Sequence, residues 1–247
     1  MQNQNGSLPS RVPALLAGAL LALATAGCGS GGDSGSGFSL QTTTRAASPS
    51  AELVVDGDWI VYLASETFSG PAGTDLNGDA DTLDDVAVVV NTRSRLESST
   101  GVAAQGAVIL GSQIYLKVDE ADGLVDWNID ADTSDIVLVH WSELAAVATF
   151  VDTLDLATST ELPIAVDGRL YYTTATAPVA GDDTSLRYVD APPPALPVTV
   201  LNVIGGGTAR VHLLGEDAGL LVCYFDEVEE GVDRNLDLDT TDEVQVA

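Results

Sequence analysis

Two recurring patterns predict an all-β protein built from four repeats. The first is Asp-x-Asn-x-Asp-x-Asp-Thr-x-Asp, which occurs at residues 75–84, 126–135 and 233–242. The second is a pair of short apolar segments joined by a polar turn with glycine, and it precedes each acidic motif. Four short strands repeated along a chain are the sequence form of a β-propeller blade. We therefore expect a β-propeller of four four-stranded blades.

The repeat length follows from the spacing of the acidic motifs. Asp81 and Asp132 occupy the same place in the first two copies and lie 51 residues apart. A further step of this length reaches Asp183, in a stretch that keeps an Asp-Thr pair and has lost the other acidic positions. The first three ligand positions of this third unit hold Ala177, Val179 and Gly181. The third unit is therefore degenerate, and we expect it to bind no ion.

Each repeat is expected to begin with a β-hairpin, because two runs rich in Val, Ile, Leu and Tyr flank a glycine turn. The four predicted hairpins span residues 55–62, 110–116, 166–172 and 214–221. Third strands are predicted at 86–90, 136–140, 186–189 and 244–246, and fourth strands at 101–104 and 146–151. No segment between residues 51 and 247 shows a convincing helical period.

The last repeat has no fourth strand after its third one. If the ring closes, residues 38–47 would supply that strand, since an open ring would expose long strand edges. The alternatives are a partial propeller from a larger ring and a ring completed by a second copy of the chain.

The N-terminal residues are expected to be a targeting element, with Arg11 followed by a run of Ala and Leu too short to span a bilayer comfortably. The run ends at Thr25-Ala26-Gly27-Cys28, which resembles the lipobox of bacterial lipoproteins. The resemblance implies a signal peptide at 1–27, acylation (palmitate) of Cys28, and, with Gly29 next, a lipid anchor in the outer membrane. The alternative is an ordinary secretory signal. After the signal peptide, residues 28–50 are expected to form a Gly/Ser-rich tether that includes the possible closing strand. Residues 51–247 are expected to form the propeller repeats.

The charge of the chain limits its partners. A net charge of −28 with only nine basic residues argues against nucleic acid and anionic lipid surfaces as partners. Of the 37 acidic residues, 16 fall in the degenerate loop and in the three full acidic loops taken with the residue that follows each of them. Carboxylates at this density repel one another unless something neutralises them.

Calcium is the predicted neutralising ion, with about three ions bound, because oxygen ligands at alternate positions can converge on one hard cation. Magnesium is less suited to so many carboxylates, and zinc lacks His or Cys ligands here. The alternative is a set of acidic, solvent-facing Asx-turns. Glu66, Glu120 and Glu227 end the second strands and could either reach the ions or cap the strand in water. The predicted ligands are Asp75, Asn77, Asp79, Asp81, Asp84, Asp126, Asn128, Asp130, Asp132, Asp135, Asp233, Asn235, Asp237, Asp239 and Asp242.

These loops resemble the calcium loops of integrin-type FG-GAP propellers, which carry Asp-x-Asn-x-Asp-Gly and a later Asp. The first three ligands carry over, whereas the later Asp stands one position further along in this chain. The hairpins resemble the Asp-Gly-x-x-x-x-Tyr hairpins of TolB-like and WD40-like bacterial propellers over about 200 residues. The resemblance implies a propeller in the bacterial cell envelope.

We expect a non-enzymatic binding or scaffold module whose partner is a protein or a polysaccharide. The chain has two histidines, His140 and His212, each alone on a predicted strand, where a structural role is the usual one. A propeller hydrolase or lactonase with a central metal is the enzymatic alternative, and a truncated propeller without independent activity is another. Cys223 lies in an apolar strand and is expected to be a small buried side chain.

Overall fold

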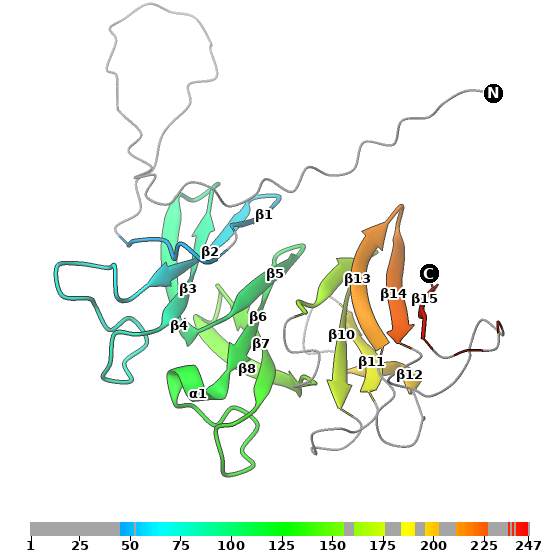
Figure 1. The fold of residues 1–247 in the computed structure, drawn as a ribbon. Helices are drawn as coiled ribbons and strands as arrows, with labels where there is room; N and C mark the ends of the chain where they lie inside the picture. The colour runs from blue at the N-terminus through cyan, green and yellow to red at the C-terminus, as the bar shows by residue number, and fades with distance from the viewer. Residues whose placement is uncertain are drawn as a thin grey trace, which may run out of the picture. The chain divides into compact units, whose positions relative to one another are not determined.

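Four antiparallel β-sheets follow one another along the chain in the computed structural model of this protein (Figure 1). The structure describes residues 45–246 except 52, 156–160, 176–183, 191–195, 203–210, 227–236, 238 and 240. The expected signal peptide at 1–27, Cys28 and residues 28–44 of the expected tether therefore lie outside the described residues. Within the described part, no helix combines the length and the apolar character needed to cross a membrane.

Each sheet corresponds to one predicted repeat of about 50 residues, and its strands are arranged in sequence order. The first sheet contains β1 (Val54–Asp56), β2 (Trp59–Ser65), β3 (Asp85–Asn91) and β4 (Leu96–Ala103). The second contains β5 (Gly106–Leu110), β6 (Gln113–Asp119), β7 (Ile136–Ser142) and β8 (Val147–Thr153). The third contains β9 (Ile164–Val166), β10 (Arg169–Ala175), β11 (Thr184–Asp190) and β12 (Val198–Asn202). The fourth contains three described strands, β13 (Val211–Asp217), β14 (Leu220–Asp226) and β15 (Glu243–Val246).

The predicted hairpins and third strands are confirmed in all four repeats, and the sequence missed two elements. One is β12, the outer strand of the third sheet. The other is α1 (Glu120–Gly123), a single helical turn after β6 with Asp119 as its N-cap. Four residues are too few to show a helical period in a sequence, so α1 left no pattern to detect.

Backbone conformation at the hairpin turns explains their glycines. In the third and fourth sheets both turn residues have positive φ, at Asp167 and Gly168 and at Ala218 and Gly219. This is the geometry of type I′ turns, whose twist matches that of the flanking strands. Glycine adopts this conformation without the steric cost that a Cβ adds.

Three of the four hydrophobic cores among the described residues lie between consecutive sheets, and the fourth is formed by buried residues of the first sheet alone, Tyr62, Ala64, Val88 and Val90. Alternate residues of one strand enter different cores, because successive side chains of a strand point to opposite faces. On β7, Val137 and Val139 pack in a core shared by the first two sheets, whereas Leu138 packs in a core shared with Leu170 and Tyr172 of the third sheet. A third core joins the third and fourth sheets. Inner strands with two buried faces are therefore apolar at nearly every position.

The stacking of the sheets follows the order expected for successive propeller blades, with β5 next to β1 and β9, and β9 next to β13. Among the described residues, no shared core joins the fourth sheet back to the first. The described end of the expected closing segment pairs with the first sheet, where Ala47 bridges Ala64 of β2. Closure of the ring remains a prediction.

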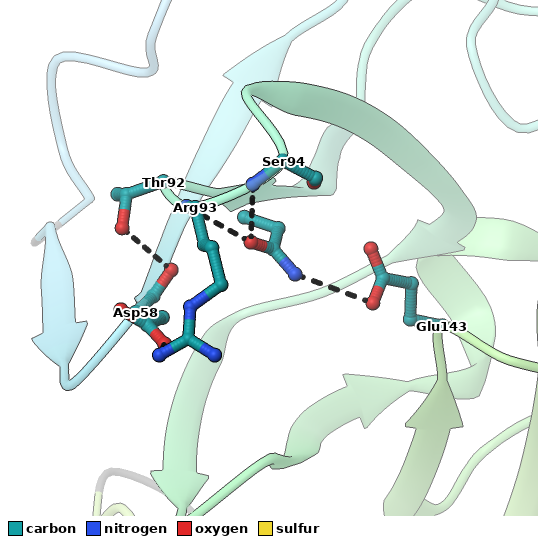
Figure 2. Close-up of polar contacts among 6 residues, drawn as sticks. Asp58, Thr92, Arg93, Ser94 and Glu143 are labelled. Atoms are coloured by element: carbon teal, nitrogen blue, oxygen red, sulfur yellow. Dashed lines mark hydrogen bonds and ion pairs between the residues drawn. The ribbon is translucent and has the colours of Figure 1, made fainter.

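Polar contacts also connect the first two sheets, at the turns between the third and fourth strands (Figure 2). The side-chain oxygen of Asn91 accepts bonds from the N–H groups of Arg93 and Ser94 and so shapes the β3–β4 turn. Its amide nitrogen then donates to Glu143 of the β7–β8 turn at 3.4 Å. Arg93 also pairs with Asp58 at 3.1 Å, an exposed ion pair that contributes little to stability.

The shared core predicts a strong contrast between two identical substitutions. Leu138→Ala removes a fully buried side chain between the second and third sheets and should lower the free energy of unfolding by about 2–5 kcal/mol. Leu144→Ala removes a fully exposed one and should change it by less than about 0.5 kcal/mol. Urea unfolding followed by tryptophan fluorescence measures both. Equal effects would contradict a core placed between the sheets.

Candidate metal centres

The acidic loops of the first two repeats fold on their own carboxylates. In each loop, side-chain oxygens at the alternate positions accept hydrogen bonds from backbone N–H groups two to five residues further along. In the first loop, Gly78 and Ala80 donate to Asp75, Asp79 to Asn77, Asp81 to Asp79, and Leu83 to Asp81, at 2.6–3.2 Å. In the second, Ile129, Asp130 and Ala131 donate to Asp126, Asp130 to Asn128, Asp132 to Asp130, and Ser134 to Asp132, at 2.6–3.2 Å. The two loops therefore share one hydrogen-bond pattern.

Both loops contain left-handed backbone at the same two positions. Gly78 and Ile129 hold the fourth position with φ of 89° and 62°, and Ala80 and Ala131 hold the sixth with φ of 79° and 81°. A β-branched residue at positive φ is strained, whereas glycine is not. Ile129 is therefore strained at the position where the first loop has Gly78. The loop shape persists despite this cost, because the carboxylate hydrogen bonds fix it.

A buried glutamate anchors each loop to the strand that precedes it. Glu66 follows β2 and Glu120 follows β6, and both side chains are 0% exposed. Oε1 of Glu66 accepts the N–H groups of Leu76 and Asn77 at 2.5 and 3.3 Å. Oε1 of Glu120 accepts the equivalent N–H groups, of Trp127 and Asn128, at 2.6 and 3.2 Å. From the sequence, these glutamates could either reach the ions or cap the strand in water. In the structure both are buried and accept hydrogen bonds from the loops.

Three carboxylate clusters result among the described residues, and within each cluster one oxygen from every residue lies within 4.8 Å of the others. Two oxygens bound to one calcium ion at about 2.3–2.6 Å can be separated by up to roughly 5 Å, so this spacing suits a shared ion. The clusters consist of Glu66, Asp79, Asp81 and Asp84 in the first repeat, Glu120, Asp132 and Asp135 in the second, and Asp237, Asp239 and Asp242 in the fourth.

Not every predicted ligand joins a cluster. In Asp75 and Asp126, both carboxylate oxygens accept hydrogen bonds from backbone N–H groups of their own loops. Asn77 and Asn128 instead donate their side-chain N–H groups to the last Asp of the loop, Asp84 or Asp135, at 2.8 and 2.6 Å.

The remaining predicted ligands divide between the second and fourth repeats. In the second repeat, Asp130 accepts from Asn128 and Asp132 and is outside the cluster of three. In the fourth repeat, Asp233, Asn235 and Glu227 lie outside the described residues, whereas Asp237 and Asp239 keep the loop hydrogen bonds.

The electrostatics of the loops separate the buried acids from the exposed ones. Burial, together with the hydrogen bond and the negative charge of Asp79, raises the pKa of Asp84 to about 7. Burial also raises the pKa of Asp135 and of Glu120. Hydrogen bonds from Ser134 lower the pKa of the exposed Asp132, and those from Thr241 lower that of Asp239. A cation within a cluster would favour the charged form of every carboxylate in it.

His140, His212 and Cys223 make contacts outside the acidic loops. His140 is bonded through Nε2 to Gln113 at 2.8 Å and lies against Tyr115, and burial lowers its pKa. His212 pairs with Glu161 at 2.7 Å and stacks on Tyr224. Neither belongs to an acidic cluster in the described part of the chain. Cys223 is buried in β14, and this burial raises the pKa of its thiol.

No protein-family model matches the chain, and no curated protein matches it either. The functional argument therefore depends on the loops themselves.

Strain at Ile129 predicts a stabilising substitution. Ile129→Gly should raise the free energy of unfolding by about 0.5–1 kcal/mol, because glycine adopts φ of 62° without a Cβ clash. Leu83→Gly is the control, since Leu83 is similarly exposed and does not have positive φ. It should be neutral or destabilising, because glycine increases the entropy of the unfolded chain. Urea unfolding in chelator checks both, and a destabilised Ile129→Gly protein would contradict the loop geometry.

Proposed function

We propose that this chain is a calcium-binding repeat protein of the bacterial cell envelope, anchored by a lipid and acting as a binding or scaffold module. The observation that supports calcium binding is the equivalence of the first two loops. Both carry the same hydrogen-bond pattern, and both bring a buried glutamate and two or three aspartates within 4.8 Å of one another.

Calcium suits these clusters better than other metals do. All side chains in them offer oxygen, and a hard cation with six to eight oxygen ligands is the type that carboxylate clusters bind. Zinc prefers nitrogen and sulfur ligands, and magnesium retains water in place of several carboxylates. Water and backbone carbonyl oxygens would complete the coordination shell.

The proposed scaffold role combines the loops with the repeat architecture. Ions would fix the loops at one end of the sheets in a closed or partial propeller, which presents a protein or polysaccharide partner with a rigid surface. Large apolar side chains beside the loops, Phe68, Leu83, Leu124 and Val125, are exposed and favour a protein partner. The lipobox-like sequence ending at Cys28 supports attachment to the outer membrane.

Calcium binding predicts a change in thermal stability. The full-length protein in detergent should bind about three ions by calorimetric titration, and its melting temperature should rise with calcium and fall again with chelator. At free calcium about 100-fold above Kd, each site should contribute about 2.7 kcal/mol. Potassium chloride at the same ionic strength is the control for screening. A protein that releases no heat and keeps its melting temperature at millimolar calcium would disprove the proposal.

The lipid anchor predicts a change of location. Cys28→Ser removes the proposed acylation site and should move the protein from the membrane fraction to the soluble fraction of the envelope. Cys223→Ser is the matched control, since it replaces a buried thiol of β14 and should leave the protein in the membrane fraction. Immunoblotting of separated fractions measures both. Membrane association that survives Cys28→Ser would show that another element holds the protein there.

A further inference from the structure

We propose that Glu120 is a direct metal ligand of the second repeat, although it lies outside the acidic motif that the sequence repeats. This inference rests on the proposed calcium binding and identifies the residue that anchors the ion to the fold. The site would consist of Glu120, Asp132 and Asp135, whose oxygens lie within 4.8 Å of one another.

The evidence is an unsatisfied carboxylate oxygen. The side chain of Glu120 is 0% exposed, and its Oε1 accepts two backbone N–H groups of the loop. Its Oε2 is buried and has no hydrogen-bond partner. A buried carboxylate oxygen without a donor is costly, and near two aspartates the expected compensation is a cation. Oε2 is therefore the oxygen that remains for an ion.

The first repeat reaches the same arrangement by a different path. Glu66 precedes Asp75 by nine residues, whereas Glu120 precedes Asp126 by six and lies in the helical turn α1. The two connections differ in length and conformation, yet each glutamate bonds the N–H groups of the second and third loop residues. Two different connections place a carboxylate at the same position in the loop. This indicates that the loop requires a carboxylate there.

The two glutamates differ in one contact. Oε2 of Glu66 accepts the N–H group of Asp84 at 3.3 Å, whereas Oε2 of Glu120 has no such donor. Glu120 is therefore the sharper test of metal ligation, because hydrogen bonds within the loop account for only one of its two oxygens.

Glu120→Gln separates ligation from loop folding, because the amide oxygen can still accept the N–H groups of Trp127 and Asn128. In chelator the variant should melt at a higher temperature than the unmodified protein, since a buried charge beside two aspartates has been removed. In calcium it should bind one ion fewer, or bind that ion at least about tenfold more weakly, and so lose part of the calcium-induced rise in melting temperature. Asp122→Asn is the control: it removes the same charge from α1 at an exposed residue outside the cluster, and it should leave all bound ions.

Terbium provides a readout specific to this loop. It substitutes for calcium, and a nearby tryptophan sensitises its emission. Among the three full acidic loops only the second contains a tryptophan, Trp127, whose backbone N–H group donates to Glu120. Glu120→Gln should lose most of the emission that Trp127→Phe also removes, and Asp122→Asn should retain it.

The outcomes distinguish the two proposals. No calcium bound by the unmodified protein would overturn the proposed function and this inference with it. Three ions bound equally by the unmodified protein and by Glu120→Gln would leave the function standing and overturn the role of Glu120. If Glu120→Gln does not fold, infrared difference spectra of unmodified protein with ¹³C-labelled glutamate carboxylates decide. Calcium-induced bands should shift with that label in a Glu66→Gln variant as well as in the unmodified protein, and bands that shift only with labelled aspartate would overturn the inference.

Discussion

Burial of a carboxylate at the end of a β-strand is the constraint on which the acidic loops depend. Glu66 and Glu120 each follow the second strand of a sheet, and each accepts two backbone N–H groups from the loop that leads to the third strand. These bonds tie the loop to the edge of the sheet and bring its aspartates toward one point. Because a charged group in this position is costly unless compensated, the carboxylate that anchors the loop would also favour a cation beside it.

The loops and the sheets stabilise each other through the same residues. Asp84 and Asp135 end their loops and directly precede the third strands, and each accepts a hydrogen bond from the loop asparagine. The N–H group of the glutamate in turn donates to the carbonyl of that aspartate, which extends the pairing of the second and third strands. An ion held in the cluster would therefore act on two central strands at once, and its effect on stability would reach the cores between the sheets.

The repeats and most strands could be predicted from sequence because both leave periodic patterns. Strands with two buried faces appear as continuous apolar runs, and the glycine turns mark where hairpins reverse. The ligand set could not be predicted in the same way. A sequence identifies which residues carry oxygen, but it does not show that Asp75 and Asp126 use both oxygens on backbone N–H groups. It also cannot show that Glu120, six residues before the motif, turns into the loop, since α1 is too short to produce a pattern.

The third repeat has lost most of the acidic motif, and acids on and beside its strands pair with arginine side chains. Its counterpart to the loops falls outside the described residues, but its strands carry two arginines that pair with acids. Arg187 of β11 bonds Asp152 of the second sheet at 2.9 Å, and Asp152 also accepts the hydroxyl of the buried Tyr172. Arg169 pairs with Asp190 across β10 and β11 at 3.0 Å. Side chains thus compensate acidic charge in the repeat without a metal motif. In the repeats with a motif, no basic side chain of the described loops joins the clustered carboxylates, so hydrogen bonds within the loop, protonation or a bound cation would compensate their charge.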